Sequence, residues 1–402
     1  MKKIISVLLA MLMLLSLCAC GQNLSQTPDT PASGIYYDIT GVHPQEIVLS
    51  VEGNEVPMEL LCYWATYHAD SLYGNLLMGY TMGGLYEECF DAESGNLLSK
   101  AVPEELGGMT LGEYVTGQTL STVKLYAAVE NLCEELGVDL TEEQSAEMDS
   151  AITNAIENLG GEEAFQEMLK EMGVSQDSYL HLIRGGYQFN NLVALVTQEG
   201  SALYLEDADC ELYRVYADHI LLSTADPLTG EAYSQEKQME QLGRARELLG
   251  KLDGLEGEEL ISTFTELANE HSEDGGRINN NGYVFGTGEM VAEFESAAFS
   301  LQPGELSGIV ESSYGYHIIL RKDIKPMLEA DPTLKATIAE EHLPSLVQLY
   351  LDEAEITTSN KIKDFDAIEF YNDYLEATGA HASEDIIGDT AANQTTTDST
   401  SK

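Results

Sequence analysis

Four residues between positions 219 and 317 are of the types that bind metals or carry protons, namely His219, His271, Asp274 and His317. They lie far apart in the sequence and lack the short ligand spacings of metal-binding motifs. Gly286-Thr-Gly288 has only two of the glycines of a dinucleotide-binding motif, and no long helix is expected after it. No Gly-x-Ser-x-Gly sequence is present for acyl transfer. The sequence therefore predicts neither a bound metal nor a cofactor.

Three apolar residues in the same region have a spacing that suits a binding pocket. Met290 and Phe294 are four residues apart in a segment expected to form a short helix near 293–299, which would place them on one face. Phe285 lies on an adjoining expected strand and would form a third wall. The alternative is that all three are ordinary core residues, which is common for a Met–aromatic pair at helical spacing.

The overall composition excludes some classes of partner. The chain has 402 residues, with 69 Asp and Glu against 19 Lys and Arg, and a formal charge of −50. Nucleic acid is an unlikely partner for such a chain, because phosphate binding depends on Lys and Arg. The same charge disfavours a broad basic patch for anionic lipids. With 44% apolar residues the chain can build real cores, and its length suggests two or three domains.

The first twenty residues have the pattern of a targeting signal. Lys2 and Lys3 precede an apolar run over 4–19, which at roughly 24 Å is too short to span a bilayer as a helix. The run ends in Leu17-Cys18-Ala19-Cys20-Gly21, which resembles a bacterial lipobox. This resemblance implies a signal peptide over 1–19, lipidation of Cys20 and a lipid anchor in the plasma membrane on its extracytoplasmic side. The alternative is an ordinary secretory signal that happens to end in a cysteine.

Helices are predicted for most of the N-terminal half. Residues 20–45 are expected to be a linker, rich in Pro, Ser and Thr over 22–34, and 46–53 to form a strand with a turn at Gly53-Asn54. A helix is expected from Pro57, and four helices with short connections over 110–200. Thr141-Glu-Glu-Gln144 has the form of a capping box, which predicts a helix start there.

The pattern changes near Leu212 to a β-α-α-β-α-β order. Val215, Ala217, His219 and Leu221 alternate as in a strand, and two helices, a second strand, a short helix and a final strand over 315–321 follow. Helical periodicity then resumes to Tyr374. Residues 378–402 contain no aromatic residue and are expected to be disordered.

Cysteine usage leaves two possibilities open. Cys62, Cys89, Cys133 and Cys210 could form two disulfides, with three possible connectivities. Cys62 and Cys133 lie in stretches of apolar periodicity, where a free cysteine packs as a small hydrophobic side chain.

Residues 213–323 resemble a parvulin-type peptidyl-prolyl isomerase domain. The resemblance rests on five blocks that stand in order: His219-Ile-Leu-Leu222, Leu267-Ala-Asn-Glu-His-Ser-Glu-Asp274, Gly282–Phe294, Ala298–Ser307 and Ser312-Ser-Tyr-Gly-Tyr-His-Ile-Ile319. Together with the lipobox and the flanking helical segments, the whole chain resembles the PrsA-type foldase lipoproteins and is similar in plan to SurA-like chaperones. The resemblance implies an α+β fold in which 46–211 and 327–377 form a helical chaperone lobe and 212–326 is an inserted isomerase domain.

The same resemblance implies roles for individual residues. His219 and His317 match the family's paired histidines, which are hydrogen-bonded across adjacent strands; a purely structural role for them is the alternative. Asp274 matches a position that is Cys in some relatives and can polarise the site, and Ser312 either joins this network or is simply a turn residue. Phe285, Met290 and Phe294 would hold the proline ring.

Two departures from the family pattern bear on function. The loop 223–231 contains two acids and no base, where phosphate-directed parvulins have an Arg/Lys cluster, so phosphorylated substrates are not expected. Asn280-Asn-Gly-Tyr-Val284 stands where many relatives read Gly-Gly-Asp-Leu-Gly. The expected function is isomerisation of X–Pro bonds in unfolded, newly exported polypeptides. The alternative is a holdase chaperone whose parvulin domain only binds peptide.

Overall fold

The computed structural model describes residues 28, 31–82, 87–91, 93–103, 106–226, 229–277 and 282–379. The predicted signal peptide, the lipidation site Cys20, nearly all of the linker up to residue 30 and the tail from residue 380 onward lie outside these residues. The chain divides into two compact units. The first unit contains the described residues up to Leu192 and from Pro344 onward, and the second is Val193–Leu343.

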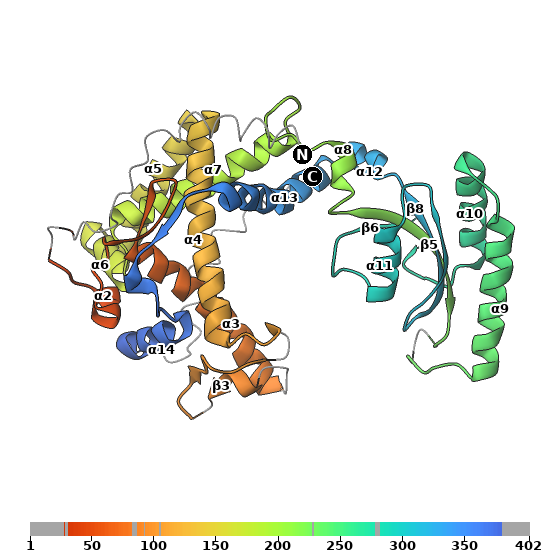
Figure 1. Cartoon of the computed structure of the whole chain (residues 1–402), viewed down its shortest axis with the longest axis horizontal. Helices are drawn as coiled ribbons and strands as arrows, with labels where there is room; N and C mark the ends of the chain where they lie inside the picture. Colours follow the sequence, from red (N-terminus) through yellow and green to blue (C-terminus); the bar gives the residue numbers. More distant parts are fainter. Residues whose placement is uncertain are drawn as a thin grey trace. The chain divides into compact units, whose positions relative to one another are not determined.

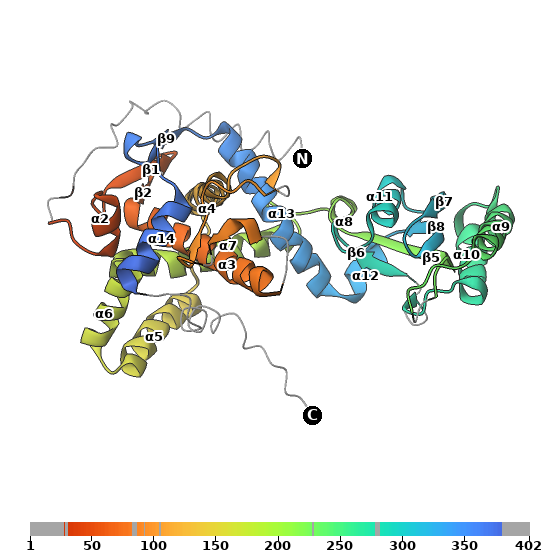
Figure 2. The same cartoon turned by 90° about the horizontal axis from the view of Figure 1, so that it is seen from below.

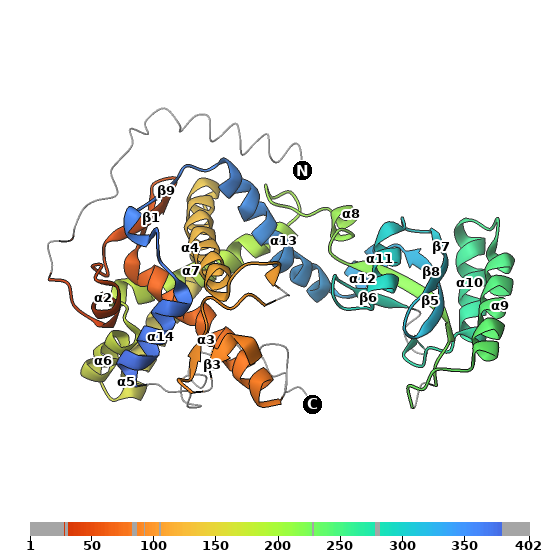
Figure 3. The same ribbon diagram turned by 60° about the horizontal axis from the view of Figure 1, so that its bottom comes forward.

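The first unit is mainly helical and is built from both ends of the chain. Helices α3 (Met58–Met82), α4 (Leu111–Leu136) and α14 (Ala367–Thr378) pack against one another. Strand β1 (Ile47–Val51) pairs antiparallel with β2 (Asn54–Pro57) on one side and with β9 (Ile356–Thr358) on the other. Because β9 comes from the C-terminal segment, the two ends of the chain share one sheet (Figure 3).

Three further helices complete this unit as predicted. They are α5 (Glu142–Leu159), α6 (Glu162–Met172) and α7 (Gln176–Thr197). Thr141 and Gln144 form the predicted capping box at the start of α5, and Gly160 ends that helix in the left-handed conformation. Helices α5 and α6 pack as neighbours (Figure 2). The smaller elements are α2 (Ile35–Thr40), η1 (Glu87–Cys89), β3 (Phe90–Asp91), β4 (Asn96–Leu97) and η4 (Asn360–Ile362).

The second unit is an antiparallel sheet between two layers of helices, with strand order β6-β5-β8-β7. Its strands are β5 (Val215–Ser223), β6 (Tyr283–Phe285), β7 (Leu306–Glu311) and β8 (Gly315–Lys322). Its helices are α8 (Asp207–Cys210), α9 (Gln235–Leu252), α10 (Gly257–His271), α11 (Ala292–Ser300), α12 (Lys325–Ala330) and the first half of α13 (Pro332–Glu353).

Alternation along β5 and β8 sends side chains to two separate cores. Ile220 and Leu222 of β5 pack with Ile318 of β8 against α9 and α10. Val215 and Ala217 pack on the opposite face, against α11 and Phe285 of β6. Figure 1 shows α9 and α10 on one side of the sheet and α11 on the other. His219 lies on the same face of β5 as Val215 and Ala217, because side chains alternate along a strand. The candidate site is therefore on the α11 side of the sheet.

The α+β fold agrees with the prediction, whereas several local expectations were wrong or incomplete. The expected linker 20–45 contains helix α2, whose Tyr36 is buried, and strand β2 was not predicted. Strand β7 was not predicted, because Leu306-Ser-Gly-Ile309 does not alternate; the register with β8 shifts there, as in a β-bulge. Strand β9 was missed because it has only three residues. Met290 is not part of the short helix, since α11 begins at Ala292 with Val291 as its N-cap.

No disulfide joins the four cysteines of the described residues, all of which are buried, so the disulfide option is wrong. Burial raises the pKa of Cys133 and of Cys210 to about 11. Among the described residues, no group of three or more His, Cys, Asp and Glu side chains is placed to hold a metal ion. No helix within the described ranges combines the length and the apolar character needed to cross a membrane.

Candidate functional site

Two histidines on neighbouring strands lie at the centre of the site. In the antiparallel register, His219 of β5 is opposite Ile319 and His317 of β8 is opposite Leu221, so the two histidines are diagonal neighbours on one face. Their rings stack with centroids 5.2 Å apart, and their Nδ1 atoms are 3.1 Å apart. Only 6% of His219 and 3% of His317 is exposed, so these histidines are almost fully removed from water.

Asp274 joins the pair from the turn after α10. Its Oδ2 lies 2.8 Å from Nε2 of His219 and accepts a hydrogen bond of 2.6 Å from the Tyr283 hydroxyl. Its Oδ1 accepts from the Gly276 amide at 3.0 Å. Burial on its own raises the pKa of Asp274, but the hydrogen bonds from His219, Tyr283 and Gly276 together outweigh burial and hold this pKa well below its ordinary value.

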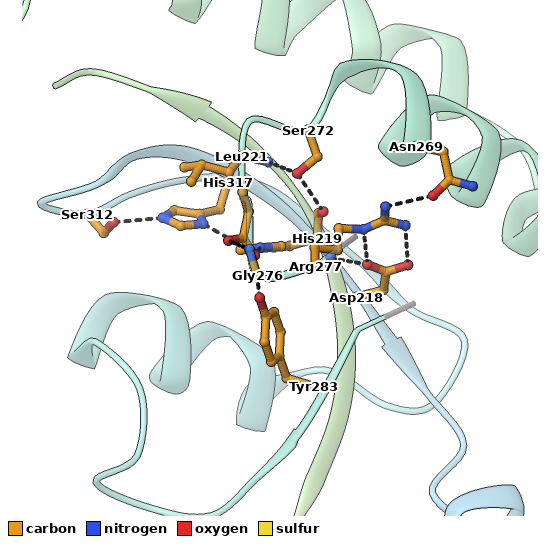
Figure 4. Close-up of polar contacts among 11 residues, drawn as sticks. Asp218, His219, Leu221, Asn269, Ser272, Gly276, Arg277, Tyr283, Ser312 and His317 are labelled. Atoms are coloured by element: carbon orange, nitrogen blue, oxygen red, sulfur yellow. Dashed lines mark hydrogen bonds and ion pairs between the residues drawn. The ribbon is translucent and has the colours of Figure 1, made fainter. Parts of the chain in front are cut away.

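Ser312 closes the other end of the same chain of hydrogen bonds (Figure 4). Its Oγ lies 2.7 Å from Nε2 of His317 and accepts from the Tyr314 amide at 3.1 Å. Burial, aided by the nearby His219, lowers the pKa of His317 to about 4, so this ring is neutral at pH 7.

For neutral imidazole rings, the ionised Asp274 fixes the direction of every hydrogen bond in the cluster. Ionised Asp274 can only accept, so His219 donates from Nε2 and is left with Nδ1 as an acceptor. His317 then donates from Nδ1, and its Nε2 accepts from the Ser312 hydroxyl. Each neutral ring is thus held in a single tautomer, and the negative charge of the cluster lies on Asp274.

An apolar layer supports the histidines from the side of α11. The ring of Phe294 lies edge-on to His219 and His317, with centroids 5.0 and 5.3 Å away, and contacts Phe285 at 5.7 Å. Phe285 is fully buried and 3% of Phe294 is exposed, whereas Met290 is half-buried in the turn before α11. Met290 is therefore the apolar candidate with the most surface for a ligand, and Phe285 supports the layer from behind.

All four predicted polar residues, His219, Asp274, Ser312 and His317, thus come together in one hydrogen-bonded cluster. His271, the fourth residue of the rejected metal set, is not part of this cluster. It lies at the end of α10, and its ring is 3.8 Å from the Glu270 carboxylate.

A buried ion pair that sequence reasoning missed fixes the turn carrying Asp274. Arg277 donates to both carboxylate oxygens of Asp218, at 2.6 and 2.9 Å, and to Asn269 of α10 at 2.8 Å. Asp218 is fully buried and 3% of Arg277 is exposed, so removal of either partner would leave a buried charge. Ser272 adds hydrogen bonds to the backbone of β5. The sequence did contain a sign of this ion pair: Asp218 lies in an otherwise largely apolar strand, where a buried carboxylate requires a partner.

Tyr283 and Gly276 were also missed as members of the cluster. Tyr283 is opposite Ala217 in the sheet and two residues before Phe285, so alternation places its side chain on the face of His219. That period of two could have identified it. Just before it, Gly282 has a φ of +119°, and a Cβ there would lie 2.4 Å from the Ala217 carbonyl oxygen. Only glycine allows the chain to enter β6 this close to β5.

Comparison with known proteins identifies the region that contains this site. Residues 219–323 match the model of the rotamase family, described as the PPIC-type PPIase domain. The chain is 30% identical over 250 residues to the foldase protein PrsA of Oceanobacillus iheyensis, which covers 60% of this chain and 69% of that protein. It is 37% identical over 136 residues to PrsA of Halalkalibacterium halodurans, covering 33% of this chain and 34% of that protein.

The match to the Halalkalibacterium protein is partial, because the chain spans only about a third of that protein's length. Among solved structures, a peptidylprolyl isomerase (PrsA) from Bacillus anthracis is similar at 23% identity, covering 61% of this chain and 96% of that chain, with a TM-score of 0.25. The Oceanobacillus alignment extends far beyond the PPIC-type domain and over two thirds of that relative. The chain therefore belongs to the PrsA foldase family and contains a PPIC-type peptidyl-prolyl isomerase domain.

Proposed function

We propose that this protein is a lipid-anchored foldase that isomerises X–Pro bonds in newly exported polypeptides on the extracytoplasmic side of the plasma membrane. Family membership supports the role in folding, and the lipobox-like end of the leader at Cys20 supports the anchor. The observation that carries the catalytic part is the buried cluster in which two histidines connect Ser312 to the ionised Asp274.

The reaction needs neither a nucleophile nor a metal. An X–Pro bond exchanges in tens to hundreds of seconds, against a barrier of about 18–20 kcal/mol. A catalyst only has to favour the twisted amide over the planar one. Twisting ends the amide resonance, so the carbonyl oxygen loses negative charge and the nitrogen gains a lone pair. The twisted amide is less polar, and a dry apolar surface suits it better than water does.

Asp274 can add an electrostatic contribution to this preference. The planar amide has the more negative carbonyl oxygen, so an anion near this oxygen destabilises the planar form more than the twisted form. The carboxylate keeps its charge because three donors hold it, and 20% of its side chain is exposed. His219 holds Asp274 in place, and the neutral ring of His317 adds no positive charge that would cancel its effect.

The apolar residues would hold the proline ring while the acyl side turns. Met290 and Phe294 lie on the α11 side of the histidines, and Met290 has the greater exposure of the two. Phe285 would act indirectly, by keeping Phe294 in place.

Phosphorylated substrates are not expected to bind well. In the described part of the loop after β5, Asp226 and Glu231 are the charged residues, and the Asp226 amide bonds to the Glu231 carbonyl. A phosphate group near this loop would be repelled.

We further propose that the helical segments 46–211 and 327–377 form a chaperone lobe and that the isomerase domain, 212–326, is inserted between them. The sheet shared by β1 and β9 supports a lobe built from both segments. This lobe would hold unfolded chain by weak apolar contacts, and its acidity would repel acidic clients.

The test is direct measurement of cis–trans exchange in a short Ala-Pro peptide by NMR, with a soluble form that begins after Cys20. We expect acceleration that His219→Ala or Met290→Ala abolishes and that Asp274→Ala reduces strongly. If the folded protein gives no acceleration but still suppresses aggregation of an unfolded client, the isomerase proposal is wrong and the holdase alternative stands.

The anchor has its own test. Metabolic labelling with a radioactive fatty acid should mark the full-length protein in the native bacterium, and Cys20→Ala should abolish the label and release the protein from membranes. A labelled Cys20→Ala variant would contradict lipidation at this residue.

A further inference from the structure

Tyr283 occupies a position in the cluster that the established family features do not assign. Its hydroxyl is 2.6 Å from Asp274 Oδ2, the same oxygen that accepts from His219 (Figure 4). Its ring also lies edge-on to the His219 ring, with centroids 5.9 Å apart and an interplanar angle of 88°. The tyrosine therefore contacts both members of the Asp–His pair.

The neighbouring backbone leaves space for this hydroxyl. A Cβ on Gly276 would lie only 2.7 Å from the Tyr283 hydroxyl oxygen, which is closer than real side chains approach. Gly275, one residue earlier in the same turn, has nothing within 4 Å of an added Cβ. Of these two neighbouring glycines, Gly276 is the one at which a side chain would displace the phenol.

We propose that Tyr283 is a positioning residue of the isomerase site, which holds the Asp274 carboxylate in one orientation and thereby sets the tautomers of His219 and His317. Only the expected effect of Tyr283 on the isomerisation rate rests on the proposed function; its effect on the histidine tautomers does not. A buried carboxylate usually has a cation as its partner. The nearby Arg277 is bound to Asp218, so Asp274 has the Tyr283 hydroxyl as a partner in place of a cation.

The hydroxyl has two physical effects. Its proton shares Oδ2 with the proton of His219, so the carboxylate cannot rotate away without losing a charge-assisted hydrogen bond. Burial, together with the bond to Asp274, raises the pKa of the Tyr283 phenol well above its ordinary value, so the phenol remains a donor at all physiological pH values. With Oδ2 fixed, His219 has one favourable tautomer, and His317 must follow it.

The test compares two pairs of matched variants in the full soluble chain. Tyr283→Phe removes only the hydroxyl, and Tyr233→Phe is its control, because Tyr233 lies under Lys237 at the start of α9. Gly276→Ala displaces the hydroxyl but keeps the tyrosine, and Gly275→Ala is its control in the same turn.

The first readout is the tautomer of each histidine, from the ¹⁵N shifts of the ring nitrogens without substrate. The wild type and both controls should show His219 protonated at Nε2 and His317 protonated at Nδ1. Tyr283→Phe and Gly276→Ala should both lose this single pattern and show averaged shifts. If Tyr283→Phe keeps the wild-type pattern in a folded protein, the proposal is wrong.

The second readout is the exchange rate of the Ala-Pro peptide. Tyr283→Phe should lower kcat/KM about tenfold, the size expected for one hydrogen bond to a charged group. In an Asp274→Asn background the same substitution should have no further effect, because Tyr283 acts through Asp274. A further tenfold loss in that background would overturn the positioning role. A wild type without activity would contradict the proposed function alone, since the tautomers still test Tyr283.

Discussion

His317 is a buried base that the fold keeps neutral, and this has a cost at low pH. Its pKa falls from 6.5 to about 4, so between these values the unfolded chain binds a proton that the folded chain does not. Stability must therefore rise with pH over this window and fall as the pH drops from 6.5 toward 4. With only 3% of the residue exposed, the loss attributable to His317 is about 3 kcal/mol.

The measurement is urea unfolding of the second unit at pH 7, 5.5 and 4.5, followed through amide signals of β5 and β8. His317→Gln should be less stable at pH 7 but should lose less stability on acidification than the wild type. Equal losses in the two proteins would mean that His317 does not titrate abnormally. Asp274 has a lowered pKa as well, but its contribution is lost only below its ordinary value near 3.8, outside this range.

The residues of the site differ in how far sequence alone could identify them. His219, Asp274, Ser312 and His317 were found because they stand in ordered blocks that resemble a known family. Tyr283 was missed although the period of two in β6 places its side chain on the face of His219. Gly276 was missed because its role depends on a contact between the turn after α10 and Tyr283, which no local pattern describes. Arg277 could be expected only as an unnamed partner of Asp218, because many cations in the chain could have taken that place.

At the scale of elements, one side chain of α14 links this helix to strand β4 of the first unit. Asn372 accepts from the Leu97 amide at 3.1 Å and donates to the Leu97 carbonyl at 2.9 Å, so it binds β4 as a neighbouring strand would. Asn372→Ala removes both hydrogen bonds and should destabilise the first unit by about 1–2 kcal/mol.

Trp64, the only tryptophan, lies in α3 of this unit, so its fluorescence during urea unfolding reports the change. Asp373→Ala, at the adjacent exposed position of α14, is the control and should change stability by less than about 0.5 kcal/mol. Equal midpoints for Asn372→Ala and the control would show that the two Asn372 hydrogen bonds add nothing to the stability of the first unit.

Elements with strong periodicity or capping signals were predictable, and short pairing strands were not. Helix α5 was found from its capping box although none of its residues is buried, because the signal is local. Strand β9 forms only because β1 offers it a free edge, at a distance of about 300 residues in the chain. Partner choice over such a separation leaves no trace in a three-residue segment.

For the whole molecule, the division into two units predicts that isomerase activity and chaperone activity can be separated by expressing the second unit alone. Every residue of the candidate site, and both cores that support its sheet, lie within Val193–Leu343. A fragment with these bounds should fold and catalyse exchange of the Ala-Pro peptide within about threefold of the full chain, since tetrapeptide-sized substrates need only the site.

The same fragment should fail to suppress aggregation of an unfolded client, because most of the helical lobe is missing. Exchange NMR and light scattering measure the two properties side by side, with the soluble full chain as reference. A folded but inactive fragment would mean that the first unit contributes directly to catalysis.

The buried cysteines have a practical consequence for such experiments. A form that begins after Cys20 retains only Cys62, Cys89, Cys133 and Cys210, all of them inside the fold. At pH 7 the thiols of Cys133 and Cys210, with pKa values of about 11, are ionised to roughly one part in ten thousand, and only the thiolate reacts with maleimides. Burial shields Cys62 and Cys89 from the reagent as well. Cysteines introduced on the surface would thus be labelled selectively in the native sequence. Fluorophore pairs placed on the two units could follow client capture and release in single molecules.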